Sequence, residues 1–201
     1  MELILIRHGL PLRVENPDGR PADPSLSVEG LRQAQLLSEW LREEELSAVY
    51  ASPLRRARET AEPLARAQGC ELEIEPGVVE LDHLSSSYVP LEEIKANDPK
   101  AWHALVTGGL YADVDLPSFR RAAAATLERI VAAHRGERVA VVCHGGVINS
   151  WAGHVLGVTE PFFFFDPGYT SVNRFLAAGS GERSVVSLNE TAHLRVRASR
   201  G

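Results

Sequence analysis

The sequence is poor in cysteine, in basic charge and in long hydrophobic runs. Its two cysteines, Cys70 and Cys143, are too few for a disulfide framework and lack metal-ligand spacing. We therefore expect reduced thiols and a cytoplasmic location. The net charge of −6 argues against a general nucleic-acid binder. No apolar run reaches the roughly 20 residues of a membrane-spanning helix, so we expect neither a membrane partner nor a secretion signal.

What the chain does contain is an alternation of strands and helices. Apolar runs at 2–6, 49–51 and 139–142 are typical of buried parallel strands. The other expected elements are helices over about 27–44, 52–68, 117–135 and 147–156, an edge strand at 72–74, and a hairpin of strands at 172–177 and 184–189. This order predicts an α/β fold, a three-layer α/β/α sandwich with a mostly parallel central sheet, in a single domain over residues 1–201.

Two segments break this regularity. Residues 10–26 hold four prolines and predict a long surface loop, and long loops in compact domains are usually functional or disordered. Residues 82–117 are irregular and are expected to be an insertion that faces the substrate. Ser52-Pro53 has the form of a serine cap followed by proline at the first helical position, which predicts a helix start.

The expected strands at 2–6 and 139–142 both lead into a His-Gly pair, at His8-Gly9 and His144-Gly145. Either histidine alone would fit a structural role. If the strands are parallel neighbours, however, both imidazoles lie at the carboxyl edge of the sheet, where ligands bind in open α/β folds. Arg7, just before His8, adds a planar donor group that matches phosphate or carboxylate.

Three arginines, Arg55, Arg56 and Arg58, open the helix after the strand at 49–51. Arg55 falls in the first turn, near the same edge, and a bound anion would compensate a cation at a helix N-terminus. At least one of the three is expected to belong to a solvated helix face. Glu80 follows the predicted edge strand; a surface position is the ordinary expectation for a glutamate, and a pocket position is the alternative.

These residue types together predict phosphoryl transfer. Arginines and imidazoles can neutralise a phosphate dianion through charge-assisted hydrogen bonds. One neutral imidazole can attack phosphorus, and a carboxylic acid can protonate the departing alkoxide. Because the cationic side chains stabilise the transferred charge, we expect neither a metal nor another cofactor.

Four segments, in order, resemble the histidine phosphatase superfamily, which contains the cofactor-dependent phosphoglycerate mutases and many phosphatases. The matching segments are Leu5-Ile6-Arg7-His8-Gly9, Leu26-Ser27-Val28-Glu29-Gly30-Leu31-Arg32-Gln33-Ala34, Ser52-Pro53-Leu54-Arg55-Arg56-Ala57-Arg58-Glu59-Thr60-Ala61 and Val141-Val142-Cys143-His144-Gly145-Gly146. The resemblance implies a phosphoglycerate mutase-like fold.

The resemblance also implies residue roles. His8 would be the nucleophile that forms a phosphohistidine, and Glu80 would be the proton donor. The phosphoryl group would be held by Arg7, Arg55, His144 and Gly145. Asp82 and His83, which follow Glu80 closely, are candidates to share or replace its role. A protonated working acid predicts an acidic to near-neutral pH optimum.

The residues after the signature segment, Leu10-Pro11-Leu12, depart from the polar residues usual in the family, so the resemblance supports the reaction and leaves the substrate open. The leading interpretation is a phosphomonoesterase acting on a small-molecule phosphomonoester. A phosphoglycerate mutase-type phosphotransferase, disfavoured by the short chain, and a non-catalytic phospho-ligand-binding regulator are the alternatives. The run Phe162-Phe163-Phe164-Phe165 is expected to pack in the core, with a homodimer contact or an apolar pocket wall as alternatives for the outward rings.

Overall fold

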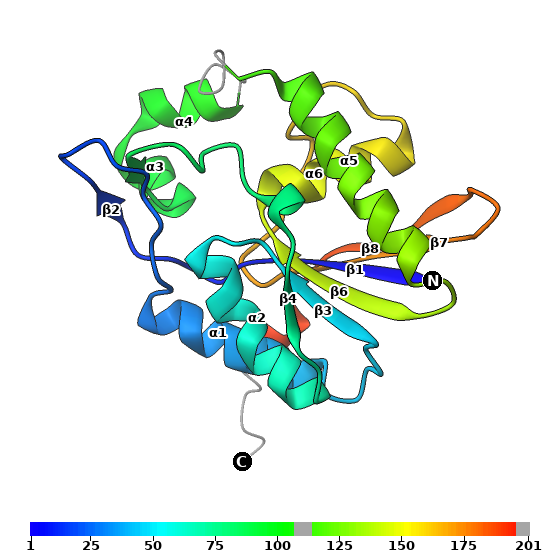
Figure 1. Ribbon diagram of the computed structural model, residues 1–201. Coiled ribbons are helices and arrows are strands. Elements are labelled where there is room, and N and C mark those ends of the chain that lie inside the picture. The colour runs from blue at the N-terminus through cyan, green and yellow to red at the C-terminus, as the bar shows by residue number, and fades with distance from the viewer. Residues whose placement is uncertain (107–113, 196–201) are drawn as a thin grey trace.

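The computed structural model describes residues 1–106 and 114–195, and its centre is a six-stranded sheet (Figure 1). The strands are β1 (Glu2–Arg7), β2 (Val14–Glu15), β3 (Ala48–Ala51), β4 (Leu72–Ile74), β5 (Ser87–Tyr88), β6 (Arg138–Cys143), β7 (Val172–Ala177) and β8 (Arg183–Glu190). The order across the main sheet is β4-β3-β6-β1-β7-β8. β4, β3, β6 and β1 pair in parallel, whereas β7 is antiparallel to both β1 and β8. The expected mostly parallel sheet with a terminal hairpin is confirmed.

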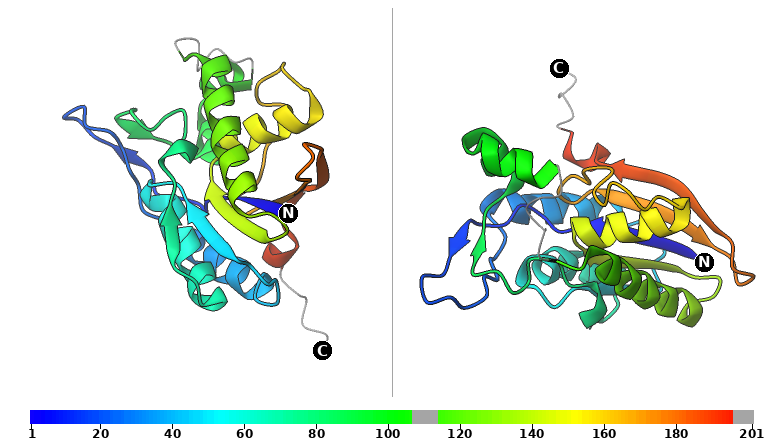
Figure 2. Two further views of the ribbon diagram at one scale, coloured as in Figure 1. Left: turned by 45° about the vertical axis from the view of Figure 1, so that its right-hand side comes forward. Right: turned by 90° about the horizontal axis from the view of Figure 1, so that it is seen from above.

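Helices cover both faces of the sheet (Figures 1 and 2). The α-helices are α1 (Val28–Trp40), α2 (Arg55–Gln68), α3 (Leu91–Asn97), α4 (Pro99–Val106), α5 (Leu116–Ala133) and α6 (Gly145–Leu156), and the short 3-10 helices are η1 (Pro76–Val78) and η3 (Ala192–Leu194). α1 and α2 pack on one face and α5 and α6 on the other. Strand β1 supplies both cores, Ile4 and Ile6 to the α1–α2 side and Leu3 and Leu5 to the α5–α6 side, all fully buried. The side chains of β1 therefore alternate between two apolar layers.

One predicted helix cap is confirmed and one is corrected. The Ser27 side chain accepts a hydrogen bond from the Gly30 N–H and caps α1, which ends at Trp40 rather than near residue 44. α2 does not begin with Ser52 as its cap; it begins at Arg55 after Leu54 as N-cap, with no side-chain cap bond. Ser52 is fully buried, and its hydroxyl bonds His144.

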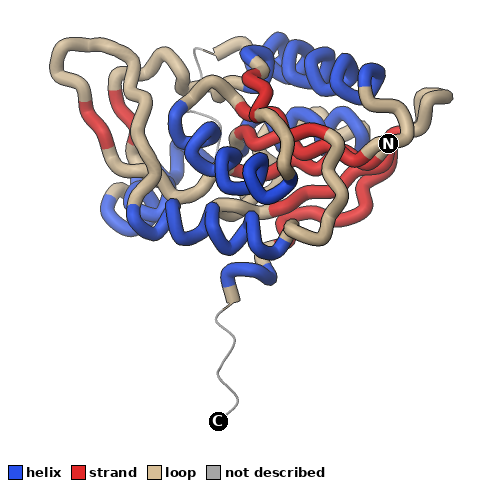
Figure 3. The backbone as a smooth tube through the Cα atoms, turned by 60° about the horizontal axis from the view of Figure 1, so that its bottom comes forward, coloured by secondary structure: helices blue, strands red, loops and turns tan. Residues whose placement is uncertain are grey.

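The two irregular segments lie together beyond the carboxyl ends of the parallel strands. β2, in the loop 10–26, pairs antiparallel with β5, in the insertion 82–117. The insertion also carries α3 and α4, while its residues 107–113 lie outside the described residues. In Figure 3 the small β2–β5 ribbon stands apart from the main sheet. The two segments therefore form one unit next to the sheet edge where His8 and His144 lie.

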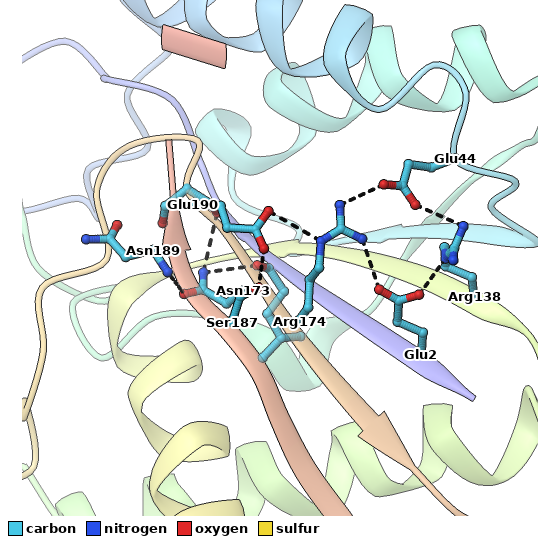
Figure 4. A network of polar contacts seen from close by, with 10 residues as sticks. Glu2, Glu44, Arg138, Asn173, Arg174, Ser187, Asn189 and Glu190 are labelled. Carbon is cyan, nitrogen blue, oxygen red and sulfur yellow. Dashed lines mark hydrogen bonds and ion pairs between the residues drawn. The ribbon is translucent and has the colours of Figure 1, made fainter. Parts of the chain in front are cut away.

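A polar network ties β1, β6 and β7 to the end of α1 (Figure 4). The Arg174 guanidinium pairs with Glu2, Glu44 and Glu190 at 2.9, 2.8 and 3.4 Å. Burial would raise the pKa of Glu2, but hydrogen bonds from Arg174 and Arg138 outweigh it, and the pKa lies below its usual value. Since several partners share each charge, this network is expected to stabilise the sheet more than an isolated surface pair would.

Among the described helices, none is both long and apolar enough to cross a membrane.

Candidate active site

The two predicted histidines meet at one edge of the sheet. β1 and β6 are parallel neighbours, and Arg7 lies opposite Cys143 in the register. The next residues, His8 and His144, therefore leave the sheet side by side, with ring centroids 5.1 Å apart. Both rings are buried, with 2% and 0% of their surface exposed. The pairing of distant His-Gly segments, expected from the sequence, is what the topology produces.

His8 is held as a neutral imidazole whose Nε2 is unprotonated. Its Nδ1 lies 2.8 Å from the Gly9 carbonyl oxygen, which can only accept, so Nδ1 carries the proton. Its Nε2 accepts a hydrogen bond from Arg56 Nε at 3.3 Å. Burial lowers the pKa of His8 well below its usual range, and the charges of Arg56 and Arg7 lower it further. An unprotonated Nε2 facing two arginines is suited to attack an anionic phosphoryl group.

Arg7 and His8 line the same cavity, and Arg7 is only 5% exposed. One guanidinium nitrogen donates to the Pro167 carbonyl at 2.6 Å and lies 3.5 Å from the Asp166 carboxylate. The guanidinium also stacks 4.2 Å from the centroid of the Tyr169 ring. Its buried Nε has no partner among the described residues. Arg7 thus has fixed orientation and a spare donor.

The structure corrects the position of the helix arginine. Arg55, chosen from the sequence, lies outside the cavity: its side chain is 55% exposed and pairs with Glu59 at 3.4 Å. The neighbouring Arg56 is 1% exposed, bonds His8 and stacks 4.7 Å from the Tyr88 ring. Of the two neighbouring arginines, it is therefore Arg56 whose guanidinium lies in the cavity beside His8.

The register of α2 explains this difference. Its buried face carries Ala57, Thr60, Ala61 and Leu64, and Arg56 lies on the same face, one turn before Thr60. The Thr60 hydroxyl donates to the Arg56 carbonyl and accepts from the Gly9 N–H, at 2.7 and 2.9 Å. α2 therefore positions an arginine beside His8 and also anchors the backbone that follows His8.

Gly9 is required by packing against α1. A Cβ on Gly9 would lie 2.8 Å from the Gly30 carbonyl oxygen, and one on Gly30 would lie 2.1 Å from the Leu10 carbonyl oxygen. The two backbones cross too closely for any side chain. This close approach brings the N-terminal end of α1 against the loop that carries His8.

A hydrogen bond with Ser52 orients the His144 ring. Its Nε2 lies 2.8 Å from the Ser52 hydroxyl, and its Nδ1 has no partner among the described residues. Ser52 Oγ also accepts from the Leu54 N–H at 3.3 Å. Burial lowers the pKa of His144 well below its usual value, and Arg56 and His8 lower it further. The ring thus keeps one nitrogen available for a ligand.

Glu80 is half-buried, and its carboxyl group lies against the start of α6 rather than out on the surface. Its two oxygens accept from the N–H groups of Leu81 and Gly146, both at 2.9 Å. Burial raises the pKa of Glu80, the nearby Asp82 raises it further, and the result is about 7. A Cβ on Gly146 would lie 2.3 Å from Glu80 Oε1, so the carboxyl group reaches this position only because residue 146 is glycine.

Asp82 and His83 have distinct positions. Asp82 lines the cavity and pairs with Arg56 at 3.1 Å. His83 Nδ1 donates to the backbone carbonyl of Glu80 at 2.7 Å, which fixes the backbone of the proposed acid.

Arg7, His8, Arg56, Glu80 and Asp82 line one cavity of about 800 Å³, and His144 is buried next to His8 behind its wall. Its polar end is lined by Arg7, His8, Arg56, Glu80 and Gly145. Within residues 1–106 and 114–195, no three His, Cys, Asp or Glu side chains are grouped as metal ligands. Guanidinium and imidazole groups thus lie beside the carboxyl group of Glu80 at this end of the cavity, a combination that suits an anionic ligand.

The loop that contacts Arg7 is fixed by residues of β7 and β8. Asn189, with a left-handed φ of 57°, accepts from the Gly168 N–H at 2.8 Å and donates to the Asp166 carbonyl at 3.3 Å. Its own N–H donates to the Asn173 side chain at 2.9 Å, as Figure 4 shows. The terminal hairpin thus contributes to the site by holding Arg7's partners in place.

Sequence reasoning missed several residues around the two arginines, namely Tyr88, Asp166, Pro167 and Tyr169. Tyr88 lies in β5 and the other three lie in the loop before β7, and no local pattern relates them to β1. Arg56 was also missed, although a signal was present: the apolar face of α2 includes its position. The Phe162–Phe165 run divides between roles. Phe162 is buried against Phe119 as expected. Phe164 and Phe165 also pack partly against the core, and Phe163, Phe164 and Phe165 line the cavity, as the pocket-wall alternative expected.

Comparison with known proteins agrees with this geometry. Residues 3–191 match the model of the histidine phosphatase superfamily, branch 1. The chain belongs to this superfamily. Phosphoserine phosphatase 1 from Hydrogenobacter thermophilus is 30% identical over 202 residues, covering 96% of this chain and 94% of that one. The predicted family is therefore confirmed.

Solved structures of the superfamily share the fold. YhfR from Bacillus stearothermophilus superposes with a TM-score of 0.77 at 25% identity, over 96% of this chain and 99% of that one. A mutant phosphoserine phosphatase from Entamoeba histolytica in complex with phosphoserine gives a TM-score of 0.75 at 23% identity, with the same coverage. These likenesses confirm the expected phosphoglycerate mutase-like fold.

Proposed function

We propose that the protein is a phosphomonoesterase that hydrolyses a small phosphorylated substrate through a phosphohistidine on His8. The observation that carries this proposal is the state of His8: a buried neutral imidazole whose unprotonated Nε2 accepts a hydrogen bond from Arg56. Membership of the histidine phosphatase superfamily and a full-length relative named as a phosphoserine phosphatase support hydrolysis.

In the first half-reaction, His8 Nε2 attacks phosphorus and the bond from phosphorus to the ester oxygen breaks. Glu80 gives its proton to that oxygen, so the leaving group departs as an alcohol. Arg7 and Arg56 hold the phosphoryl oxygens, and Arg56 takes the role first assigned to Arg55. The two guanidinium groups stabilise the charge that spreads over these oxygens in the transition state.

In the second half-reaction, Glu80 is a carboxylate and accepts a proton from water as the water oxygen attacks phosphorus. Phosphate leaves, and His8 returns to its neutral form. If Ser52 donates its hydroxyl proton to His144 Nε2, then His144 Nδ1 carries a proton and can donate to a phosphoryl oxygen. The otherwise unpartnered Nδ1 supports this role.

The test of this function is phosphate release from a panel of phosphomonoesters, alongside 3-phosphoglycerate with 2,3-bisphosphoglycerate. We expect release of inorganic phosphate and no isomerisation of phosphoglycerate. Isomerisation without phosphate release would instead support the mutase alternative. Tight binding of phosphomonoesters without any turnover would support the regulator.

The proton-donor role of Glu80 predicts a pH dependence. Because its pKa is about 7, the protonated fraction falls as pH rises above 7, and kcat for an alkyl phosphate is expected to fall about tenfold per pH unit there. Glu80→Gln should lower kcat for alkyl phosphates by about 10²–10³-fold and remove this alkaline decline. The measurement is kcat against pH for both proteins.

The leaving group provides the control. p-Nitrophenolate departs without a proton, so phosphorylation of His8 by p-nitrophenyl phosphate should be impaired much less by Glu80→Gln. This is read as the burst of nitrophenolate in the first turnover. Equal losses for both ester types, or a wild-type rate that still climbs well above neutral pH, would refute Glu80 as the acid.

A cytoplasmic location and a homodimer stay predictions. Both cysteines are free thiols, and Cys143 is fully buried in β6, which suits a reducing compartment.

A further inference from the structure

The cavity extends well beyond the space that a phosphoryl group needs. Arg7, His8 and Arg56 occupy one end of its roughly 800 Å³, and the remaining walls are formed largely by apolar side chains. A phosphomonoester bound at His8 must place its leaving group in this remaining space. The character of those walls therefore indicates what the leaving group is.

One wall is the aromatic segment Phe163–Phe165, and its place beside the phosphate end is fixed. The next two residues in the chain, Asp166 and Pro167, contact the Arg7 guanidinium directly. The rings of Phe164 and Phe165 lie 5.3 Å apart, centroid to centroid. An apolar surface thus begins within a residue of the groups that hold Arg7.

Hydrogen bonds from α6 hold this aromatic segment in place. The fully buried Asn149 of α6 donates to the carbonyls of Gly145 and Phe165 at 3.0 and 3.1 Å. Its side-chain oxygen accepts from the N–H groups of Phe164 and Phe165, at 3.1 and 3.4 Å. One amide therefore satisfies the backbone of the aromatic segment and fixes it relative to Gly145.

A second group of apolar lining side chains comes from the insertion. Leu91 and Ile94 of α3 and Trp102 of α4 line the same cavity. The Lys95 ammonium lies 5.3 Å from the centroid of the Trp102 ring, so the cation of this wall faces an aromatic ring. The two walls together form an apolar slot that suits a ring or a branched chain.

Two carboxylates that line the cavity pair with the arginines of its phosphate end, whereas the Lys95 ammonium lies over the Trp102 ring. Asp82 faces Arg56 at 3.1 Å, and Asp166 faces Arg7 at 3.5 Å. A zwitterionic leaving group such as serine brings an ammonium and a carboxylate, and burying either charge against phenylalanine rings is costly unless it reaches a counter-charge. An apolar leaving group would gain instead from each CH₂ or ring that it buries.

We propose that the substrate class is a phosphomonoester with an apolar, ring-sized organic leaving group, bound between Phe163–Phe165 and the Trp102 wall. This inference rests on the proposed function for its reaction. An apolar leaving group would give this protein a different substrate preference from that of the relatives named as phosphoserine phosphatases.

The test first measures binding, which does not depend on turnover. Three phosphonates are compared by calorimetry: 3-phenylpropylphosphonate, propylphosphonate and 2-amino-4-phosphonobutanoate, which replace the ester oxygen of 2-phenylethyl phosphate, ethyl phosphate and phosphoserine by CH₂. We expect the phenyl compound to bind about tenfold to a hundredfold more tightly than either of the others. Equal or tighter binding of the amino acid phosphonate overturns the proposal.

Variants locate the preference. Phe165→Ala and Trp102→Ala each shorten one of the apolar side chains that line the cavity. Each should reduce the ratio of 3-phenylpropylphosphonate affinity to propylphosphonate affinity severalfold, with little change in the affinity for propylphosphonate itself. Leu176→Ala, half-exposed on β7 and outside the cavity, is the matched control. If the ratio survives both wall substitutions in folded protein, the slot is not where the ring binds.

The corresponding esters separate this proposal from the proposed function. All three are alkyl phosphates, so differences in kcat/KM report recognition more than leaving-group acidity. We expect 2-phenylethyl phosphate to be hydrolysed about tenfold or more faster than phosphoserine. If no ester is hydrolysed while 3-phenylpropylphosphonate still binds most tightly, the proposed phosphatase function is refuted and the proposed apolar binding slot is supported.

Discussion

Replacing His8 by alanine lowers kcat/KM by at least about 10⁴-fold in our account, since the covalent route is lost altogether. Binding of phosphate analogues should persist, because Arg7 and Arg56 remain. Phosphate release from an alkyl phosphate measures the first effect, and calorimetry measures the second. His8 packs against His144 and Tyr169, so a melting curve should accompany both.

A matched histidine provides the control. His154, half-exposed on α6, lies outside the cavity and pairs with Glu128 at 3.4 Å. His154→Ala should keep kcat/KM within about twofold of wild type, as is usual for surface substitutions. Turnover of His8→Ala within tenfold of wild type would rule out a phosphohistidine on that residue.

The adjacent arginines give the second large effect. Arg56→Ala should reduce kcat/KM by about 10³-fold, because it removes a charge-assisted donor to the phosphoryl group and the partner of His8. Arg55→Ala should change kcat/KM by about twofold or less, because that side chain is 55% exposed and faces Glu59. Comparing the two single variants decides between the sequence-based and the structure-based assignment.

A spectroscopic readout separates this role from a merely structural one. The positive charge of Arg56 contributes to the lowered pKa of His8, after burial. Removing that charge should therefore raise the His8 pKa toward its usual value, which an NMR titration of the ring protons can follow. A large loss of activity in Arg55→Ala with a small one in Arg56→Ala would contradict our assignment.

Much of this site could be predicted from the sequence because its central residues directly follow two buried strands in the chain. Apolar runs that stop at Arg7-His8-Gly9 and His144-Gly145 define both a parallel sheet and its functional edge. The pairing of β1 with β6 then brings the two imidazoles within 5.1 Å. Here the local pattern and the topology point to the same residues.

The choice between Arg55 and Arg56 shows how a one-residue shift changes the outcome. Both lie in the first turn of α2, and a rule based on the helix start cannot separate them. Helical periodicity can: Thr60 and Leu64 are on the buried face, and Arg56 precedes them at intervals of four. The helix start was also placed too early, since Ser52 bonds His144 instead of capping α2.

The leaving-group slot could not be predicted, because it depends on contacts between distant segments. The four phenylalanines are conspicuous in the sequence, yet only the Asn149 amide and the contacts of Asp166 with Arg7 place three of them at the cavity. Their partners on α3 and α4 belong to an insertion without a decodable pattern. Specificity lies in these nonlocal contacts, while the reaction lies in the strand ends.

The central claim is a covalent phosphoryl group on His8, and rapid quenching tests it most directly. The protein is mixed with p-nitrophenyl phosphate, denatured in alkali within milliseconds, digested and examined by mass spectrometry. Our account predicts one phosphoryl group on the peptide that contains His8, stable in alkali and lost in acid, and absent from His8→Ala. Turnover with no phosphopeptide, or with phosphate on a different residue, would contradict it.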